Sequence, residues 1–308
     1  MEKVLVTGGA GFIGSHLVAR LRERNASVVV LDNLSSGSLE LLEGAPAGWE
    51  FVQGDVLDAP ALLEGRSFDV VYHLAALISG HDSLQDPDAY LKTNVTGLLR
   101  LVDAVGRPGT HVVFASSSTV YGGRGGLHSE ADAPAPVTVY ALSKLAGEHL
   151  LSMYAPLRGF THTSLRLFNV YGPHQSPDHA YANVTCKFAK AAAAREPVVL
   201  FGDGAQSRDF VFVDDVVRAF LDVSSPTHEP VYNVGTGLET SIAQLLELAG
   251  RLSGRSLDVD RKPPWPNDVR SVRANTRRYV DAFGPPAPVD LEAGLGRTIA
   301  WFAERAER

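Results

Sequence analysis

The chain has 308 residues, of which 45% are hydrophobic and 20% are charged, so it can bury a full core and is not a disordered protein. Its formal net charge of −7 argues against nucleic acid as a primary partner, because such proteins usually carry a basic surface. The single cysteine excludes an internal disulfide, and neither a signal peptide nor an apolar stretch of about 18 residues is visible. We therefore expect a cytoplasmic protein with no membrane partner.

Short apolar runs alternate with helical patterns along the first two-thirds of the chain. The runs are continuous rather than alternating, as in parallel strands that are covered on both faces. The expected strands are 4–7, 28–32, 70–74 and 112–116, and the expected helices are 14–24, 91–105 and 141–154. This alternation indicates right-handed β-α-β units, and it predicts an α/β fold with a doubly wound parallel sheet of the Rossmann type.

The rest of the chain predicts a smaller C-terminal α/β domain that binds the substrate. Its expected helices are 182–194, 214–223, 242–252 and 292–304, with a strand at 198–201 and Pro-rich loops at 263–266 and 285–288. We place the domain boundary near Pro173. Residues 209–236 show a second helix-then-strand pattern, and we expect them to return to the first domain.

A glycine-rich turn follows the first expected strand and precedes the first expected helix. Gly8 permits the tight turn, Gly11 lets the backbone approach a pyrophosphate, and Gly14 allows close packing of the helix on the sheet. The helix N-terminus offers N–H groups to phosphate. Asp32 ends the next strand, where a carboxylate accepts hydrogen bonds from both ribose hydroxyls and repels a 2′-phosphate. The pattern predicts binding of NAD rather than NADP.

A second group of residues is suited to proton transfer. Tyr140 and Lys144 stand four residues apart at the start of an expected helix, so they share one face. A nearby ammonium and an oxidised nicotinamide, both positive, can lower the pKa of the tyrosine toward neutrality. Hydroxyl side chains at 116–119 follow the strand at 112–116, at the edge of the sheet where ligands of open α/β folds bind.

Taken together, these segments resemble the extended short-chain dehydrogenase/reductase family, and most closely its UDP-glucose/galactose 4-epimerase branch. The matching motifs are Thr-Gly-Gly-Ala-Gly-Phe-Ile-Gly at 7–14, Tyr-His-Leu-Ala-Ala at 72–76, Ser-Ser-Ser-Thr-Val-Tyr-Gly at 116–122, Tyr-x-x-x-Lys at 140–144, Arg-Leu-Phe-Asn-Val-Tyr-Gly-Pro at 166–173, Gly-Asp-Gly at 202–204, Arg-Asp-Phe-Val at 208–211 and Asp-Asp-Val at 214–216. The resemblance covers most of the chain.

The resemblance implies a role for individual residues. Tyr140 would take the proton of the sugar 4-hydroxyl, Lys144 would hold the nicotinamide ribose, and Ser117 would hydrogen-bond the 4-oxygen. The implied NAD pocket comprises Tyr140 and Lys144 together with Gly8, Gly11, Phe12, Ile13, Asp32, Asn33, Asp55, Val56, Leu74, Ala75, Ala76 and Asn94. The implied substrate site comprises Ser117, Ser118, Tyr140, Asn169, Arg208 and Arg270. The resemblance also implies a homodimer whose interface is built from the helices around 91–105 and 141–154. It implies no metal site.

The resemblance leaves the nucleotide and the sugar open. Trp265 stands where many epimerases carry a second phosphate-binding arginine, and Arg261 or Arg270 could replace it. A UDP-linked glucose or galactose, N-acetylhexosamine or glucuronate remains compatible with the sequence. The alternative functions are a nucleotide-sugar dehydratase or decarboxylase, and a non-catalytic protein that binds NAD or a nucleotide. Ser118 and Thr119 disfavour the dehydratase or decarboxylase, whose relatives place acidic residues there.

Overall fold

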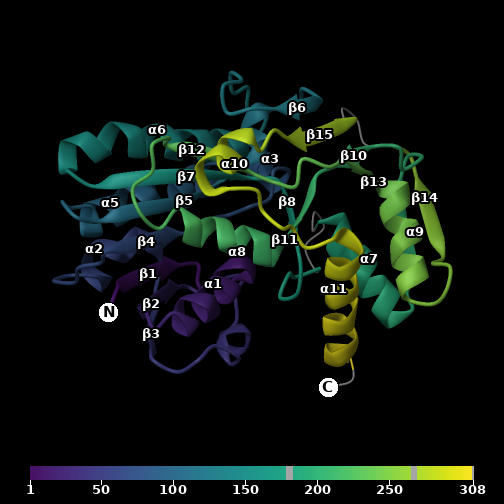
Figure 1. The fold of residues 1–308 in the computed structure, drawn as a ribbon, viewed down its shortest axis with the longest axis horizontal. Helices are drawn as coiled ribbons and strands as arrows, with labels where there is room; N and C mark the ends of the chain where they lie inside the picture. Colours follow the sequence, from purple (N-terminus) through teal and green to yellow (C-terminus); the bar gives the residue numbers. More distant parts are fainter. Residues whose placement is uncertain (178–182, 265–268, 307–308) are drawn as a thin grey trace. The chain divides into compact units, whose positions relative to one another are not determined.

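The computed structural model describes residues 1–177, 183–264 and 269–306 (Figure 1). The described chain divides into two compact units. The first comprises Met1–Gly122, Ala133–Leu167 and Val217–Tyr232, and the second comprises Gly123–Asp132, Phe168–Val216 and Asn233–Arg308. The short segment Gly123–Asp132 belongs to the second unit because its strand β6 (Gly126–His128) pairs there with β15 (Ser271–Ala274).

Among the described residues, the first unit is built on a seven-stranded sheet. Its strands are β1 (Lys3–Thr7), β2 (Ser27–Asp32), β3 (Trp49–Gln53), β4 (Val70–His73), β5 (His111–Ser117), β7 (Thr161–Leu167) and β12 (Val231–Val234). They lie in the order β12-β7-β5-β4-β1-β2-β3, and the pairs from β3 to β7 are parallel. The predicted doubly wound parallel sheet is thus confirmed. The strand order reverses between β1 and β4, where open sheets of this kind bind their ligands.

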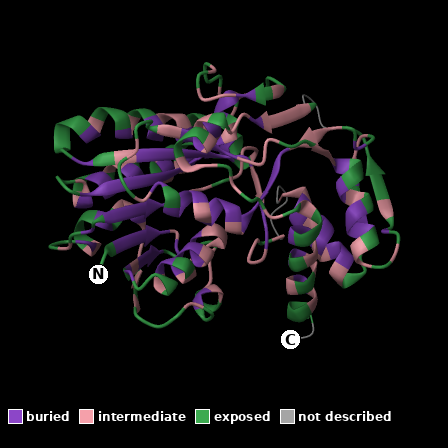
Figure 2. Cartoon of the chain, viewed as in Figure 1, coloured by how far each residue is buried: buried purple, intermediate pink, exposed green. Residues whose placement is uncertain are grey.

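Helices cover both faces of this sheet. They are α1 (Phe12–Glu23), α2 (Ala59–Leu62), α5 (Gly97–Val105), α6 (Val139–Arg158) and α8 (Val213–Asp222), and the buried strands between them appear in purple in Figure 2. Leu101 of α5 and Leu151 of α6 belong to one buried cluster with Val71 of β4. Tyr72 points to the other face, because side chains alternate along a strand, and its ring lies 6.2 Å from that of Phe220 in α8.

The expected helix at 91–105 is interrupted at its start. Leu91–Thr96 (η3) forms a π-helical turn, and the regular α-helix begins only at Gly97. A β-carbon at Gly97 would lie 2.7 Å from a methyl group of Val56, so the helix approaches the neighbouring segment closely at this point. Such π-helical turns are frequent at functional sites. The shorter elements of this unit are η1 (Leu39–Leu42), η2 (Val56–Asp58), α3 (Asp82–Gln85), α4 (Pro87–Tyr90) and η4 (Ser118–Tyr121).

The second unit combines small sheets with helices, as the sequence predicts for its α/β class. Its described strands besides β6 and β15 are β8 (Asn169–Tyr171), β9 (Val198–Phe201), β10 (Ser207–Arg208), β11 (Phe210–Phe212), β13 (Thr240–Ser241) and β14 (Val259–Lys262). They form the arrays β13-β10-β15-β6, β11-β8 and β14-β9. The helices are α7 (Val184–Ala194), α9 (Ile242–Leu252), α10 (Arg277–Phe283) and α11 (Leu291–Ala306). Ser241 and Gln244 cap α9 reciprocally, which explains why its predicted bounds are correct.

Candidate functional site

The glycine-rich turn between β1 and α1 can hold a phosphate. Gly8 has a φ of 71°, and a β-carbon there would lie 2.7 Å from the amide nitrogen of Ala75. A β-carbon on Gly14 would overlap the Gly8 carbonyl oxygen. Gly11 is the N-cap of α1 and has no side chain that could accept a hydrogen bond. The N–H groups of the first turn are therefore not capped by a side chain and can donate to a ligand. Phe12 and Ile13 form the half-buried start of this helix.

Asp32 joins the glycine turn to the end of β2. Its Oδ2 accepts a hydrogen bond from Ala10 N at 3.0 Å, and its Oδ1 accepts one from Leu34 N at 2.8 Å. These bonds fix the carboxylate in place but use only part of its capacity, because an ionised carboxylate has about four lone-pair sites. The remaining sites suit a pair of hydroxyl groups.

The other predicted cofactor residues follow the neighbouring strands. Asn33 Nδ2 donates to Asp55 Oδ2 at 2.9 Å, and Val56 is buried beside them. Leu74, Ala75 and Ala76 are half-buried residues that directly follow β4.

Asn94 of the π-helical turn has an internal role. Its Oδ1 accepts from Leu77 N at 2.8 Å, and its Nδ2 donates to Leu77 O and to Ser143 Oγ, both at 2.9 Å. Asn94 is buried, and it ties the segment after β4 to α6. Its role as a cofactor-channel residue stays a prediction, and in the structure its side chain joins these two segments.

Tyr140, Lys144 and Ser117 come together in the first unit. Thr138 caps α6 by accepting from Ala141 N at 3.1 Å, and this places Tyr140 in the first turn. Ser117, which ends β5, lies near enough to the Tyr140 hydroxyl to lower the pKa of that hydroxyl. Lys144 Nζ lies 5.9 Å from the centre of the Tyr140 ring and donates to Ala115 O at 2.9 Å. The arrangement joins two hydroxyl groups and a buried amine.

The protein environment alone does not make Tyr140 a base. Burial raises the pKa of Tyr140 above its ordinary value, and the hydrogen bond with Ser117 opposes this only in part. Burial also lowers the pKa of Lys144 to about 7, so near neutrality its amine is only partly charged. The expected lowering of the tyrosine pKa therefore needs a further positive charge close to the hydroxyl.

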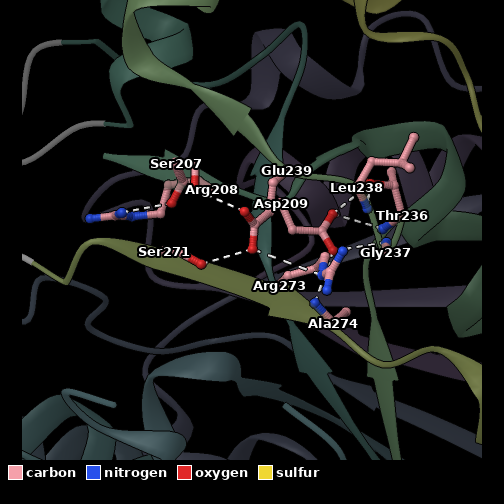
Figure 3. Close-up of polar contacts among 10 residues, drawn as sticks. All are labelled: Ser207, Arg208, Asp209, Thr236, Gly237, Leu238, Glu239, Ser271, Arg273 and Ala274. Carbon is pink, nitrogen blue, oxygen red and sulfur yellow. Dashed lines mark hydrogen bonds and ion pairs between the residues drawn. The ribbon is translucent and has the colours of Figure 1, made fainter. Parts of the chain in front are cut away.

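The second unit contains the residues that we expect to bind a diphosphate, and Figure 3 shows one of them, Arg208, with its neighbours. Arg208 Nη1 donates to Ser207 O at 2.8 Å and to Val269 O at 2.7 Å, which holds the guanidinium against β10. Asn169 lies on β8, where its backbone N–H donates to Asp209 O at 3.1 Å. Arg270 is exposed, and its carbonyl oxygen accepts from Ser207 N at 2.9 Å. These groups are thus carried by adjacent segments of one unit.

Asp209 is a member of this region that the sequence did not single out. Its carboxylate is fully buried and accepts from Thr236 N, Thr236 Oγ1, Gly237 N and Ala274 N at 2.7–3.0 Å (Figure 3). Asp209 therefore fixes the backbone that follows Arg208 against two other segments. Its position directly after the arginine gave no hint of this role, because the donors are distant in sequence.

Trp265 and Arg261, which the sequence relates to a second phosphate contact, lie outside this group. Trp265 lies outside the described residues, whereas Arg261 is exposed on β14. Within the described ranges, no cluster of His, Cys, Asp and Glu is suited to a metal ion. Among the helices that the structure describes, none has the length and apolar character needed to cross a membrane.

Comparison with known proteins gives consistent matches over the whole chain. The model of the NAD dependent epimerase/dehydratase family matches residues 4–235. A UDP-glucose 4-epimerase of Mycolicibacterium smegmatis is 38% identical over 99% of this chain and 100% of its own length.

Solved structures agree with this match. A UDP-N-acetylglucosamine 4-epimerase from Methanobrevibacter ruminantium, in complex with UDP-N-acetylmuramic acid, superposes with a TM-score of 0.91 at 32% identity, over 99% of each chain. A UDP-glucose 4-epimerase from Thermus thermophilus, in complex with NAD, has a TM-score of 0.88 at 36% identity, over 97% of this chain and 98% of that one.

Proposed function

The chain belongs to the NAD dependent epimerase/dehydratase family, and from this premise we propose that it is an NAD-dependent 4-epimerase of a UDP-linked hexose. The observation that carries the proposal is the grouping of Tyr140, Ser117 and the buried Lys144, in which Lys144 Nζ lies 5.9 Å from the centre of the Tyr140 ring. Acid–base groups of this kind serve proton transfer at a hydroxyl that is being oxidised and reduced. In this proposal the first unit binds the cofactor and the second binds the nucleotide.

The residues of the first unit fit NAD. The glycine turn leads into α1, whose first-turn N–H groups have no side-chain cap and can bind a pyrophosphate, and Asp32 retains acceptor sites for ribose hydroxyls. When bound, NAD would supply the redox chemistry of the reaction, a reversible hydride transfer at C4 of the sugar.

Within this scheme, each catalytic side chain has a separate task. Tyr140 takes the proton of the 4-hydroxyl and later returns one to the 4-oxygen. Ser117, near the Tyr140 hydroxyl, aligns the 4-oxygen, with Ser118 next to it in the chain. Lys144 is held by Ala115 O and contributes positive charge whenever it is protonated. Asn169, Arg208 and Arg270 bind the diphosphate from the second unit.

The reaction is tested with a panel of UDP-glucose, UDP-N-acetylglucosamine and UDP-glucuronate, with products identified by NMR. An epimerase gives the C4 epimer, and deuterium placed at C4 stays at C4 because the same cofactor returns it. A dehydratase moves that hydrogen to C6 and releases water, and a decarboxylase releases carbon dioxide from the glucuronate. Deuterium at C6, loss of carbon dioxide, or no turnover with any sugar would contradict the proposal.

The preference for NAD over NADP depends on Asp32. Its negative charge, anchored by the glycine turn, would repel a 2′-phosphate. We expect calorimetric titration of cofactor-free protein to give tighter binding of NAD than of NADP. Equal or tighter binding of NADP would contradict this assignment.

A second copy of the chain is the partner that we propose for α6. Leu142, Met153 and Leu157 are 47%, 59% and 75% exposed, although all three are apolar. At about 100° per residue they fall within an arc of about 60° on one face of the helix. Leu91 of η3 adds a further exposed apolar side chain. We expect light scattering to show a dimer, and Leu157→Glu to shift it toward monomer; a monomeric wild type would contradict the proposal.

A cytoplasmic location is proposed on the basis of the single cysteine. Cys186 is buried, and because it is the one cysteine of the chain, an internal disulfide is excluded. Fractionation of producing cells is expected to recover the protein with the cytoplasmic fraction.

A further inference from the structure

A buried ionic network lies on the same helix as Tyr140 and Lys144. Glu148 and Arg166 have side chains that are each only 6% exposed. Arg166 Nε donates to Glu148 Oε1 at 3.0 Å, and Nη2 donates to Oε2 at 2.7 Å. This is a two-pronged pair of the kind that restricts both distance and orientation.

Two hydroxyl groups extend the network. Ser116 Oγ donates to Glu148 Oε1 at 2.5 Å, and Arg166 Nη1 donates to the Tyr121 hydroxyl at 3.0 Å. All four residues are buried. The network therefore connects four segments of the first unit through side chains alone.

These segments carry the proposed catalytic residues. Tyr140, Lys144 and Glu148 follow one another at intervals of four residues, so they lie along one side of α6. Ser116 is the immediate neighbour of Ser117, which is the last residue of β5.

The other end of the network lies on the neighbouring strand and turn. Arg166 is paired in register with Ser116 across β5 and β7. Tyr121 ends the turn η4, whose first residues follow Ser117 directly. A shift of α6 along β5 would break the bonds of Glu148 to both strands.

A contribution to stability does not by itself explain an ion pair in this place. A buried pair loses the hydration of both charges, and apolar side chains of similar volume often stabilise a core equally well. What a pair adds is a fixed geometry, and misplacement by about 1 Å can slow an enzymatic step by about a hundredfold. The network connects α6, which carries Tyr140, to β5, which carries Ser117. It therefore fixes the distance between these two elements, on which proton transfer depends.

We propose that Glu148 and Arg166 are positioning residues, which hold α6 against β5 so that Tyr140 and Ser117 meet at the 4-oxygen of the sugar. The inference rests on the proposed epimerase function for its kinetic consequences. The geometric part, the bonds of Glu148 in α6 to Ser116 in β5 and to Arg166 in β7, does not depend on which reaction the protein catalyses.

Glu148→Gln tests the proposal, because it keeps the shape of the side chain and removes its charge. We expect kcat to fall at least about tenfold, a modest part of the loss that misplacement can cause, with KM for the sugar nucleotide and the amount of bound NAD unchanged within about twofold. Leu101→Ala is the matched control, since Leu101 lies in the α5 core and its truncation lowers stability without touching the network. At a temperature well below its unfolding midpoint, Leu101→Ala should keep its kcat.

A double variant separates position from stability. Glu148→Leu with Arg166→Met replaces the pair by apolar side chains, and we expect its urea midpoint to exceed that of Glu148→Leu alone while kcat stays low. Recovery of kcat together with the midpoint would overturn the proposal, as would full kcat in Glu148→Gln or an equal loss in Leu101→Ala.

A measurement without substrate distinguishes this proposal from the proposed function. The pKa of Tyr140 is followed by ultraviolet difference titration of NAD-free protein, with Tyr140→Phe as the reference. Because Ser117 lowers this pKa, a displacement of α6 from β5 in Glu148→Gln should raise it. If the wild type turns over no UDP-sugar, the proposed function fails, and the titration still decides the positioning role. An unchanged Tyr140 pKa would overturn that role.

Discussion

Glu148 and Asp209 are both buried carboxylates, yet the two units of the molecule stabilise them differently. Glu148 in the first unit binds a guanidinium and a hydroxyl, all on side chains. Asp209 in the second unit accepts mainly from backbone N–H groups, together with the Thr236 hydroxyl. The first arrangement fixes one element relative to another, and the second fixes the course of the backbone itself.

The difference matches the task proposed for each unit. Proton transfer depends on the spacing of groups on different elements, here α6 and β5, so a side-chain network between the elements can control it. Binding of a diphosphate depends on where one segment presents its charged side chain. Asp209 directly follows Arg208, and its carboxylate anchors this segment of the backbone. We therefore expect changes in the first unit to act on kcat and changes in the second to act on KM and on stability.

The largest effect is expected for Tyr140→Phe. The variant removes the hydroxyl that takes the proton and leaves the ring, so the fold and NAD binding should persist. General-base losses are about 10²–10⁴-fold, so kcat should fall by at least about a hundredfold, as measured by NMR of the product. Tyr154→Phe, on the same helix, is the control and should stay close to wild type. A Tyr140→Phe variant with near-normal turnover would end the assignment of this base.

Asp209→Asn should lower the free energy of unfolding by about 2–4 kcal/mol, because the new amide turns N–H groups toward buried donors that lose an acceptor. Urea denaturation measures this change. Asp203→Asn is the matched control, since Asp203 also accepts from a backbone N–H, of Ala205, but is exposed. If both variants were equally stable, the carboxylate of Asp209 would not anchor its segment as the structure indicates.

Arg208→Gln should weaken binding of the sugar nucleotide more than it slows the chemical step. A hydrogen bond to a charged group contributes about 1.5–3 kcal/mol, so KM should rise by about ten- to a hundredfold, while kcat changes little. Initial rates over a range of UDP-sugar concentrations measure both constants. Arg251→Gln, which removes an exposed ion pair with Glu292 in the same unit, should leave both unchanged. A fall in kcat with an unchanged KM would contradict this role and would mean that Arg208 acts in the chemical step rather than in substrate binding.

The sequence was sufficient for the central strands but not for all of the sheet. The continuous apolar runs that became β1, β2, β4 and β5 were predicted, because burial on both faces leaves a plain pattern. The polar strand β7, with the sequence Thr-His-Thr-Ser-Leu-Arg-Leu, gave no such pattern, since several of its polar groups are paired inside the protein. The spacing of four residues places Glu148 on the same side of the helix as Lys144, and this can be read from the sequence. Its pairing with Arg166 on β7 can be found only from the fold.

The smallest predicted effect concerns pH and isolates the buried amine. Burial lowers the pKa of Lys144 from its ordinary value near 10.5 to about 7. Between these two values the unfolded chain binds a proton at Lys144 that the folded protein does not, so the contribution of Lys144 to stability rises with pH above about 7. His73, which faces Lys144, has its pKa lowered by burial and by Lys144 to about 3, so it remains neutral throughout this range.

Lys144→Met should abolish this rise. We expect urea denaturation of NAD-free protein between pH 7 and pH 9 to show that wild type gains stability relative to Lys144→Met by less than about 1.4 kcal/mol per pH unit, the limit for one proton. The methionine of Lys144→Met also changes the free energy of unfolding by an amount that does not depend on pH. This amount does not affect the slope of the stability difference against pH. Lys92→Met, at an exposed position, should run parallel to wild type. Parallel curves for wild type and Lys144→Met would mean that the amine keeps its ordinary pKa, and the second positive charge would then be unnecessary for Tyr140 to act as a base.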